Sequence, residues 1–337
     1  MCDESGNTGE NVTGSQDAVF SEGSHDLTAS ESAKILDWVR VESGSKAEEV
    51  KWKSIRHDEH LVHELFSKHL HGRARFYLTE KSYFVVGKVV DLLLEEHAHR
   101  SGDNLYTNGE ARKRALLLYR NGRRSLGEDM WTSLLGSFNS LMRRDSANQK
   151  RKAVQKTTVE EFFDQIDVAR SRSTRRNVTD ILHELVATRS VADDFVAELD
   201  PGQQLIPALD PLIPSLAETI RHWYYDNGKR RVDVLHDEGP VPSSAAMDAL
   251  REGLQTKGEF RLIAPPVAVG TITTGNSAAD VRLQVADLVA GFGAQSGRLA
   301  LQGSLNEPLL STVRDMILPT SIWGDDESAE LLGLELG

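Results

Sequence analysis

The residues at the start of the chain are of types and spacing that could do chemistry. Asp3 and Glu4 open the sequence DESGNTG, so two carboxylates stand directly before a segment of turn-forming residues. Carboxylate oxygens at the end of a short strand are well placed to hold Mg²⁺, which prefers oxygen ligands and keeps part of its water. The segment therefore indicates metal-assisted chemistry, although Asp, Ser and Gly also form ordinary turns.

Further acidic residues lie far along the chain. The residues from Arg230 to His236 alternate as a β-strand does, which places Asp237 and Glu238 at the strand's end and His236 on its other face. A helix is expected to begin near Ser277, and one of its faces carries a polar line made of Asp280, Gln284, Asp287 and Gly291. Taken alone, such a line is more typical of an amphipathic helix than of a ligand set.

Other reactive residue types do not form a recognisable site. Cys2 is the single cysteine, which excludes an internal disulfide and a cysteine-based zinc site. His57, His60 and His63 recur every third residue, but they span a broad helical arc and are interpreted as a solvated face. The chain has no Gly-x-Ser-x-Gly elbow and no Gly-Lys-Ser/Thr phosphate loop, which disfavours serine hydrolases and nucleoside triphosphatases.

Length and hydropathy favour a globular protein in the cytoplasm. With 337 residues, 39% of them apolar, and a mean hydropathy of -0.38, the chain can form one large domain or two smaller ones. No apolar run approaches the roughly 20 residues that cross a bilayer, and the start of the sequence lacks a secretory signal. We therefore expect no membrane contact.

Positive charge is concentrated in the middle of a chain whose net charge is -12. From Arg112 to Arg176, sixteen Lys or Arg and seven Asp or Glu give a segment charge of +9. A nucleic-acid backbone is a plausible partner, because each neutralised phosphate releases counterions. A solvated helical face that balances acidic surfaces elsewhere explains the pattern equally well. The paired arginines that would contact phosphates are Arg123, Arg124, Arg143, Arg144, Arg175 and Arg176.

Hydrophobic periodicity divides the chain into three parts. The first is mixed, with a strand expected over 73–79 and a helix over 83–96. The middle is helical, and Pro-containing steps between 199 and 214 mark the boundary to a second mixed part. In that part a further short strand is expected over 260–264.

Three segments together resemble a known family. DESGNTG at the start, VLHDE at 234–238 and RLQVADLVAG at 282–291 are similar to the three signatures of the bacterial family catalogued as domain of unknown function 3800. Weaker similarity lies at 48–52 (EEVKW) and at Glu80 and Lys81. The resemblance implies an α/β protein with a ribonuclease-H-like fold, in which a mixed central sheet flanked by helices carries acids on its strands and a later helix supplies the last acid.

The resemblance also implies which residues act. Carboxylates that converge from distant positions can hold two divalent ions, here Mg²⁺ or Mn²⁺, which activate a water and stabilise the leaving oxygen of a phosphodiester. The acids expected to be catalytic are Asp3, Glu49, Asp237 and Asp287. The expected metal ligands are Asp3, Asp237 and Asp287, with Glu4 and Glu238 as further candidates. Lys51 and Lys81 are expected to contact phosphates as point charges.

The basic helices are then an insertion between two halves of a core. The expected segments are a first part of the core (1–100), a basic helical insertion (101–198), a second part of the core with the last acidic helix (199–300) and a C-terminal tail (301–337). The sequence departs from the family pattern in two places. Only Met1 and Cys2 precede Asp3, where members usually carry a few apolar strand residues, and 11–32 is polar where a second strand is expected.

These observations favour a metal-dependent nuclease that acts on RNA, DNA or a hybrid. The alternative is a nucleic-acid-binding or partner-binding module of the same fold with weak or no catalysis, and a hydrolase of small phosphoesters is a third possibility that requires a closed pocket. A protein partner or a homodimer is compatible with the sequence. A function in mobile elements or phage defence follows by analogy with the family only.

Overall fold

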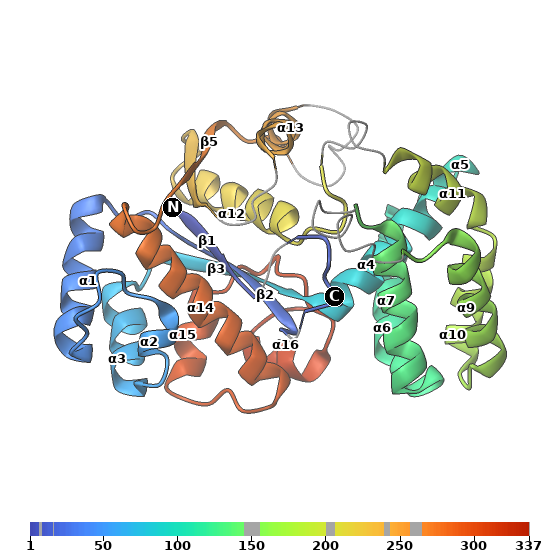
Figure 1. Cartoon of the computed structure of the whole chain (residues 1–337), viewed down its shortest axis with the longest axis horizontal. Coiled ribbons are helices and arrows are strands. Elements are labelled where there is room, and N and C mark those ends of the chain that lie inside the picture. The colour runs from blue at the N-terminus through green and yellow to red at the C-terminus, as the bar shows by residue number, and fades with distance from the viewer. Residues whose placement is uncertain are drawn as a thin grey trace. The chain divides into compact units, whose positions relative to one another are not determined.

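The chain is seen here in a computed structural model that describes residues 1–6, 9–15, 17–144, 156–199, 206–238, 243–256 and 265–336 (Figure 1). It forms two compact units. Unit 1 comprises Met1–Thr8, Asp17–Glu80 and Pro211–Gly337, and unit 2 comprises Gly9–Gln16 and Lys81–Asp210. The helical unit thus begins before the boundary at 101 that the sequence indicated.

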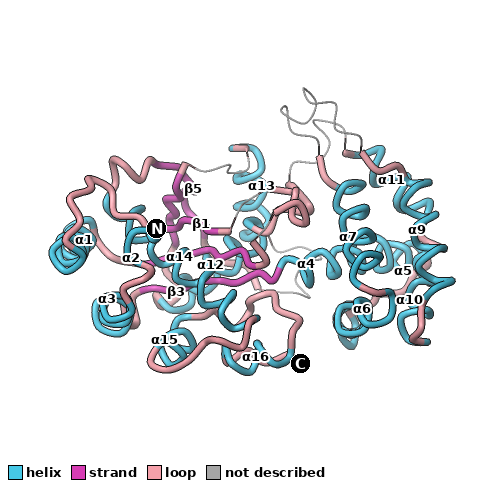
Figure 2. Tube along the Cα trace, turned by 60° about the horizontal axis from the view of Figure 1, so that its bottom comes forward, coloured by secondary structure: helices cyan, strands magenta, loops and turns pink. Residues whose placement is uncertain are grey.

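Unit 1 is built on a five-stranded sheet of order β3-β2-β1-β4-β5 (Figure 2). The strands are β1 (Cys2–Ser5), β2 (Val19–His25), β3 (Ala74–Glu80), β4 (Val232–Asp237) and β5 (Val269–Gly275). β2 runs antiparallel to β1 and β3, whereas β4 runs parallel to β1 and β5. The expected α/β class with a mixed sheet flanked by helices is confirmed. The strand expected over 260–264 lies outside the described residues.

Helices cover both faces of this sheet. One face packs against a long helix, α14 (Val281–Leu301), which crosses β1, β2 and β3 (Figure 1). Around α14 lie α1 (Ala29–Ser43), α2 (Trp52–Ile55), α3 (Glu59–Glu64), the π-helix η1 (Leu65–His69), α15 (Leu309–Met316) and α16 (Asp326–Leu332). The other face packs against α12 (Leu212–Asp226) and α13 (Ser244–Gln255). The sheet therefore has two separate apolar cores, one on each face.

Strand β2 is polar in sequence and nevertheless fully buried. Two of its side chains find partners outside the sheet: the Trp223 indole N–H donates to Ser24 Oγ at 3.0 Å, and His25 Nδ1 accepts from the Leu27 N–H at 3.1 Å. His25 Nε2 lies 2.7 Å from the Arg282 carbonyl oxygen, and burial lowers the pKa of His25 to about 3, so the ring stays neutral. At Ser24 and His25, hydrogen bonds thus replace the apolar contacts that a buried strand usually makes.

Gly23 in β2 allows α14 to approach the sheet closely. A Cβ at this position would overlap the backbone of Ala290 and lie 2.7 Å from its Cα. We expect Gly23→Ala to lower the free energy of unfolding by about 1–3 kcal/mol, because the helix must move away from the strand. The measurement is chemical unfolding of both proteins.

The matched control is Gly253→Ala in α13, where a Cβ would meet no atom within 4 Å. That substitution is expected to raise stability by about 0.5–1 kcal/mol through helix propensity. If both variants are stabilised, the close approach of α14 to β2 does not depend on Gly23.

The end of the chain is folded into unit 1. Residues 301–337 were expected to form a tail, yet they contain α15 and α16, and Ile317 and Ile322 pair with β3. Trp323 and Leu332 are fully buried in the core beneath α14. The acidic stretch that begins at Asp325 therefore starts a packed helix, and the Asp325 side chain accepts the Ser328 N–H at its N-terminus.

Unit 2 is helical in the described residues. Its helices are α4 (Lys81–Val89), the π-helix η2 (Val90–Glu95), α5 (Glu96–Arg100), the 3₁₀ turn η3 (Thr107–Gly109), α6 (Glu110–Leu126), α7 (Glu128–Met142), α9 (Val159–Arg172), α10 (Arg176–Val186) and α11 (Arg189–Glu198). Large apolar side chains such as Phe138, Phe162 and Leu182 are buried between them. Across the described ranges of both units, no helix has the length and apolar character needed to cross a membrane.

Candidate metal-binding site

Three of the expected acids come together on the α14 face of the sheet. Asp3 lies in β1 and is 6% exposed; its cross-strand neighbour is Gly23, against which α14 packs. Asp237 ends β4, and its Oδ1 accepts the Ser277 N–H at 2.9 Å. Asp287 lies in α14. Two strands and one helix that are distant in sequence thus supply the carboxylates.

The charges of these acids act on one another. Burial, followed by the negative charges of Glu4, Asp287 and Asp237, raises the pKa of Asp3 to about 8. Burial also raises the pKa of Asp287, and the charges of Glu49 and Asp237 add to it. Such shifts are typical of carboxylates that share a site without enough positive charge.

A short segment before α2 supplies the fourth acid and a cation. Glu49 forms an ion pair with Lys51 and accepts the Ser277 hydroxyl at 2.9 Å. Burial alone would lower the pKa of Lys51, but the hydrogen bond to Glu49 and the charges of Asp287, Glu49 and Asp3 raise it. Burial would likewise raise the pKa of Glu49, but its hydrogen bonds to Lys51 and Ser277 lower it. Both groups are therefore charged beside the buried acids.

Trp52 fixes the position of Asp287. The Trp52 backbone N–H donates to Asp287 Oδ2 at 2.8 Å. The Trp52 side chain packs on Gly291 of α14, where an added Cβ would fall 2.5 Å from the indole Cδ1. Gly291 thus lets α2 lie against α14, and this contact orients the carboxylate one helical turn earlier.

Two residues that organise this region were not identified from the sequence. Gln284 Oε1 accepts the Val50 N–H at 3.2 Å, and its amide nitrogen donates to the Ser277 carbonyl at 3.0 Å. The Ser277 backbone and hydroxyl in turn bond Asp237 and Glu49. The only sequence signal for Gln284 is its place in the polar line that contains Asp287. Gln284 and Ser277 together join the segment before α2, the end of β4 and the start of α14.

The other two candidate ligands lie elsewhere. Glu238 is exposed beyond β4, where its carboxylate accepts from the Asn276 amide at 3.4 Å. Glu4 alternates with Asp3 along β1 and so faces α12 instead of α14. Its Oε2 lies 3.3 Å from His236 Nε2.

On that opposite face, His236 lies between two carboxylates. His236 and Glu22 are fully buried, and His236 Nε2 lies 3.5 Å from Glu22 Oε2. Burial alone would lower the pKa of His236, but the charges of Glu22 and Glu4 raise it to about 10. The ring is therefore an imidazolium. Its positive charge compensates the carboxylates of Glu4 and Glu22, on the face of the sheet opposite to Asp3.

The donor chemistry of the α14 face suits a hard cation. Asp3, Asp237 and Asp287 offer only oxygen atoms, and burial together with the charges of neighbouring acids raises the pKa of Asp3. Within the described residues, no three acidic, histidine or cysteine side chains are close enough to enclose an ion by themselves. Mg²⁺ usually takes one or two carboxylates and keeps several waters, so it does not need such a closed set.

Comparisons of the chain with protein-family models, curated proteins and solved structures find no match. The similarity to domain of unknown function 3800 thus remains a prediction from the three sequence signatures. The function has to be argued from the geometry of the site.

The expected phosphate-binding residues fall into different environments. Lys51 lies at the acid site, as described above. In unit 2, Lys81 and Arg143 are buried, and they donate to Ser15 Oγ at 3.0 Å and to Asn11 Oδ1 at 2.7 Å. Arg144 is paired with Glu10 at 2.8 Å. The candidates whose side chains are exposed are Arg123, Arg124, Arg175 and Arg176. The basic cluster at 150–152 lies outside the described residues.

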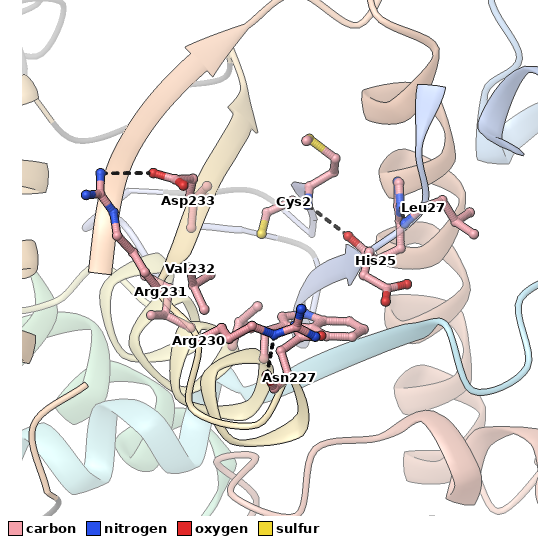
Figure 3. A pocket seen from close by; sticks show the side chains of 14 residues that line it. Cys2, His25, Leu27, Asn227, Arg230, Arg231, Val232 and Asp233 are labelled. Carbon is pink, nitrogen blue, oxygen red and sulfur yellow. Dashed lines mark hydrogen bonds and ion pairs between the residues drawn. The ribbon is translucent and has the colours of Figure 1, made fainter. Parts of the chain in front are cut away.

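A separate cavity of about 460 Å³ opens at the other end of the sheet, where β1 and β4 begin (Figure 3). Arg230 and Arg231 lie on its rim, and Arg231 pairs with Asp233 at 3.5 Å. Cys2 and Val232 lie at its wall. None of the acids of the α14 face lines it.

Proposed function

We propose that the chain is a metal-dependent nuclease with a ribonuclease-H-like core, in which Asp3, Asp237 and Asp287 hold Mg²⁺ or Mn²⁺. The observation that carries this proposal is the placement of three carboxylates, from β1, β4 and α14, on one face of a mixed sheet, where their charges add to the raised pKa values of Asp3 and Asp287. Acids on sheet strands with the last one on a later helix are what the family resemblance implies.

The residues around the acids would have different functions in such a site. Divalent ions at these carboxylates would supply an activated water and charge stabilisation for the leaving oxygen. Trp52 and Ser277 hold Asp287 and Asp237 through backbone N–H groups, so the oxygens are oriented before substrate binds. Lys51 places a cation beside the acids, where it can contact a substrate phosphate.

The exposed arginines of unit 2 support a nucleic-acid substrate. Arg124 makes no ion pair among the described residues, and Arg176 is 94% exposed with its nearest carboxylate, Asp180, at 3.9 Å. Exposed and weakly paired arginines can neutralise backbone phosphates at little desolvation cost.

The test is cleavage of labelled single-stranded and duplex RNA and DNA by the purified chain, with Mn²⁺ or with a chelator. We expect cleavage with Mn²⁺, none with chelator, and a loss of at least about 100-fold in Asp287→Asn, which keeps the side-chain shape. Asp315→Asn in α15 is the matched control, because that acid lies on the surface and is expected to leave the rate unchanged.

Salt-sensitive binding without cleavage in the wild type, unchanged in Asp287→Asn, would reject the nuclease. It would favour the alternative, a nucleic-acid-binding module of the same fold. Cleavage that is equally fast in Asp287→Asn would mean that this site is not where the chemistry occurs.

A further inference from the structure

A second cavity lies beside the acid site, between α2, α3, the C-terminal half of α14 and the loop before α15. Its volume is about 630 Å³, which is in the range of small-molecule sites. Phe292, Leu299 and Leu305 supply an apolar surface, while His60, His63 and Gln295 supply polar groups. An apolar surface with a few hydrogen-bonding groups is typical of ligand sites.

The cavity and the acid site share two elements. Trp52 lines the cavity with its side chain and holds Asp287 with its backbone N–H. α14 carries Asp287 and then Phe292 and Gln295, which lie about 8 to 12 Å further along the helix axis. A polymer bound at the acids could therefore reach the cavity with the next one or two of its units.

Two wall residues carry a buried polar atom that lacks a partner. Trp52 Nε1 and His63 Nδ1 are inaccessible and make no hydrogen bond within the part of the chain that the structure describes. Buried polar groups are nearly always hydrogen-bonded, so such atoms call for an explanation. The Trp52 indole N–H can only donate and His63 Nδ1 can donate or accept, so these two rings leave hydrogen-bonding capacity unused at the wall of the cavity.

The charges at the rim do not select a highly charged ligand. Arg56 contributes a cation, Glu59 and Glu307 contribute anions, and the Arg56 guanidinium already donates to His57 at 3.1 Å. Net charge would therefore not hold a polyphosphate there. A flat, uncharged group with a polar edge fits both the apolar surface and the mixed rim.

We propose that this cavity binds one unpaired nucleobase of a single-stranded nucleic acid whose backbone lies at the acids. The inference rests on the proposed nuclease function and adds to it the substrate class. A base in a duplex is stacked and its edge is paired, so it would have to leave the helix before entering. Duplexes are therefore poor substrates, and a base one or two positions from the cleaved bond contributes to binding.

The test is a binding experiment with the Asp287→Asn chain and short fluorescent single-stranded oligonucleotides in which one position at a time is abasic. We expect loss of the base at one position to weaken binding about tenfold or more, and at the other positions much less. The variant Gln295→Trp, which places an indole in the cavity and fills part of it, should bind every oligonucleotide like the abasic one. Ser304→Trp, at an exposed rim position, tests the same point without touching α14.

His71→Ala is the control, since His71 is exposed and does not line the cavity. An equal effect at every position, or an abasic effect that persists in both filled variants, overturns the inference. Cleavage by the wild type without any abasic effect overturns this inference alone. An abasic effect that the filled variants remove, without cleavage by the wild type, supports the cavity and overturns the proposed nuclease.

Discussion

Asp3→Asn is expected to make the metal-free protein more stable and to abolish metal-dependent cleavage. The substitution replaces a carboxyl group whose ionised form is disfavoured by burial and by the charges of Glu4, Asp287 and Asp237, while Asn keeps an oxygen for the hydrogen bond that Asp3 accepts from the Glu4 N–H at 2.7 Å. Cleavage should fall by at least about 100-fold, because a ligand of the catalytic ion is lost.

The gain in stability should depend on pH. The pKa of Asp3 is raised from 3.8 to about 8 by burial and by neighbouring acids. Between these values the folded chain holds a proton that the unfolded chain has released, so the stability of the wild type falls as pH rises through this window. Asn has no such proton. The advantage of Asp3→Asn should therefore grow from about pH 4 to pH 8, as measured by urea unfolding in chelator.

Divalent ions should reverse this order of stability and make the wild type more stable than Asp3→Asn. On the proposed function, Mn²⁺ should bind the folded wild type and stabilise it by mass action, whereas Asp3→Asn should gain much less. The control is Asp233→Asn: Asp233 is exposed in β4, and the backbone N–H of Thr271 lowers its pKa. That variant should gain no stability and keep its cleavage rate. If Asp3→Asn unfolds more easily than the wild type at pH 8, then the ionised Asp3 carboxylate does not destabilise the metal-free protein, which would contradict this prediction.

Strands with apolar alternation could be predicted from the sequence, whereas β2 could not. The strand expected over 73–79 and the strand that ends at Asp237 are present as β3 and β4. β2 was missed because Ser24 and His25 are buried through hydrogen bonds to partners that a pattern of residue types does not reveal. α16 was missed for a related reason. It is a short, acidic segment with few apolar residues, so the sequence does not reveal that Leu332 is fully buried.

The acids of the site were identified because their segments resemble a family, and not because of their spacing. Residue type alone does not distinguish an exposed arginine from one that serves the fold, which is why Arg143, now seen buried against Asn11, was grouped with Arg176. Likewise, Gln284 accepts the backbone N–H of Val50, and the backbone N–H of Ser277 donates to the side chain of Asp237, so each acts on a segment that is distant in sequence. Such contacts become visible only once the chain is folded.

His236→Leu is expected to lower the free energy of unfolding by about 3–5 kcal/mol at pH 7, because it removes the positive charge that compensates the buried carboxylates of Glu4 and Glu22. The control His71→Leu changes an exposed ring and should shift stability by less than about 0.5 kcal/mol. Chemical unfolding of the three proteins measures both effects.

The pH dependence separates this charge effect from a loss of packing. The pKa of His236 is raised from 6.5 to about 10, so the stability that its charge supplies is fully present below pH 6.5 and is lost as pH rises toward 10. The difference between wild type and His236→Leu should therefore shrink over that window. A difference that stays constant with pH would show that the ring contributes by packing alone.

A double-mutant cycle with Glu22→Gln tests whether the two groups act as a pair. In His236→Leu both acids face each other across β1 and β2 without the imidazolium, and neutralising Glu22 removes that repulsion. The double variant should therefore be more stable than the sum of the single losses, by about 0.5–3 kcal/mol, the range found for residues in direct contact. Strict additivity would mean that His236 and Glu22 do not interact, and that the ring contributes to stability independently of this carboxylate.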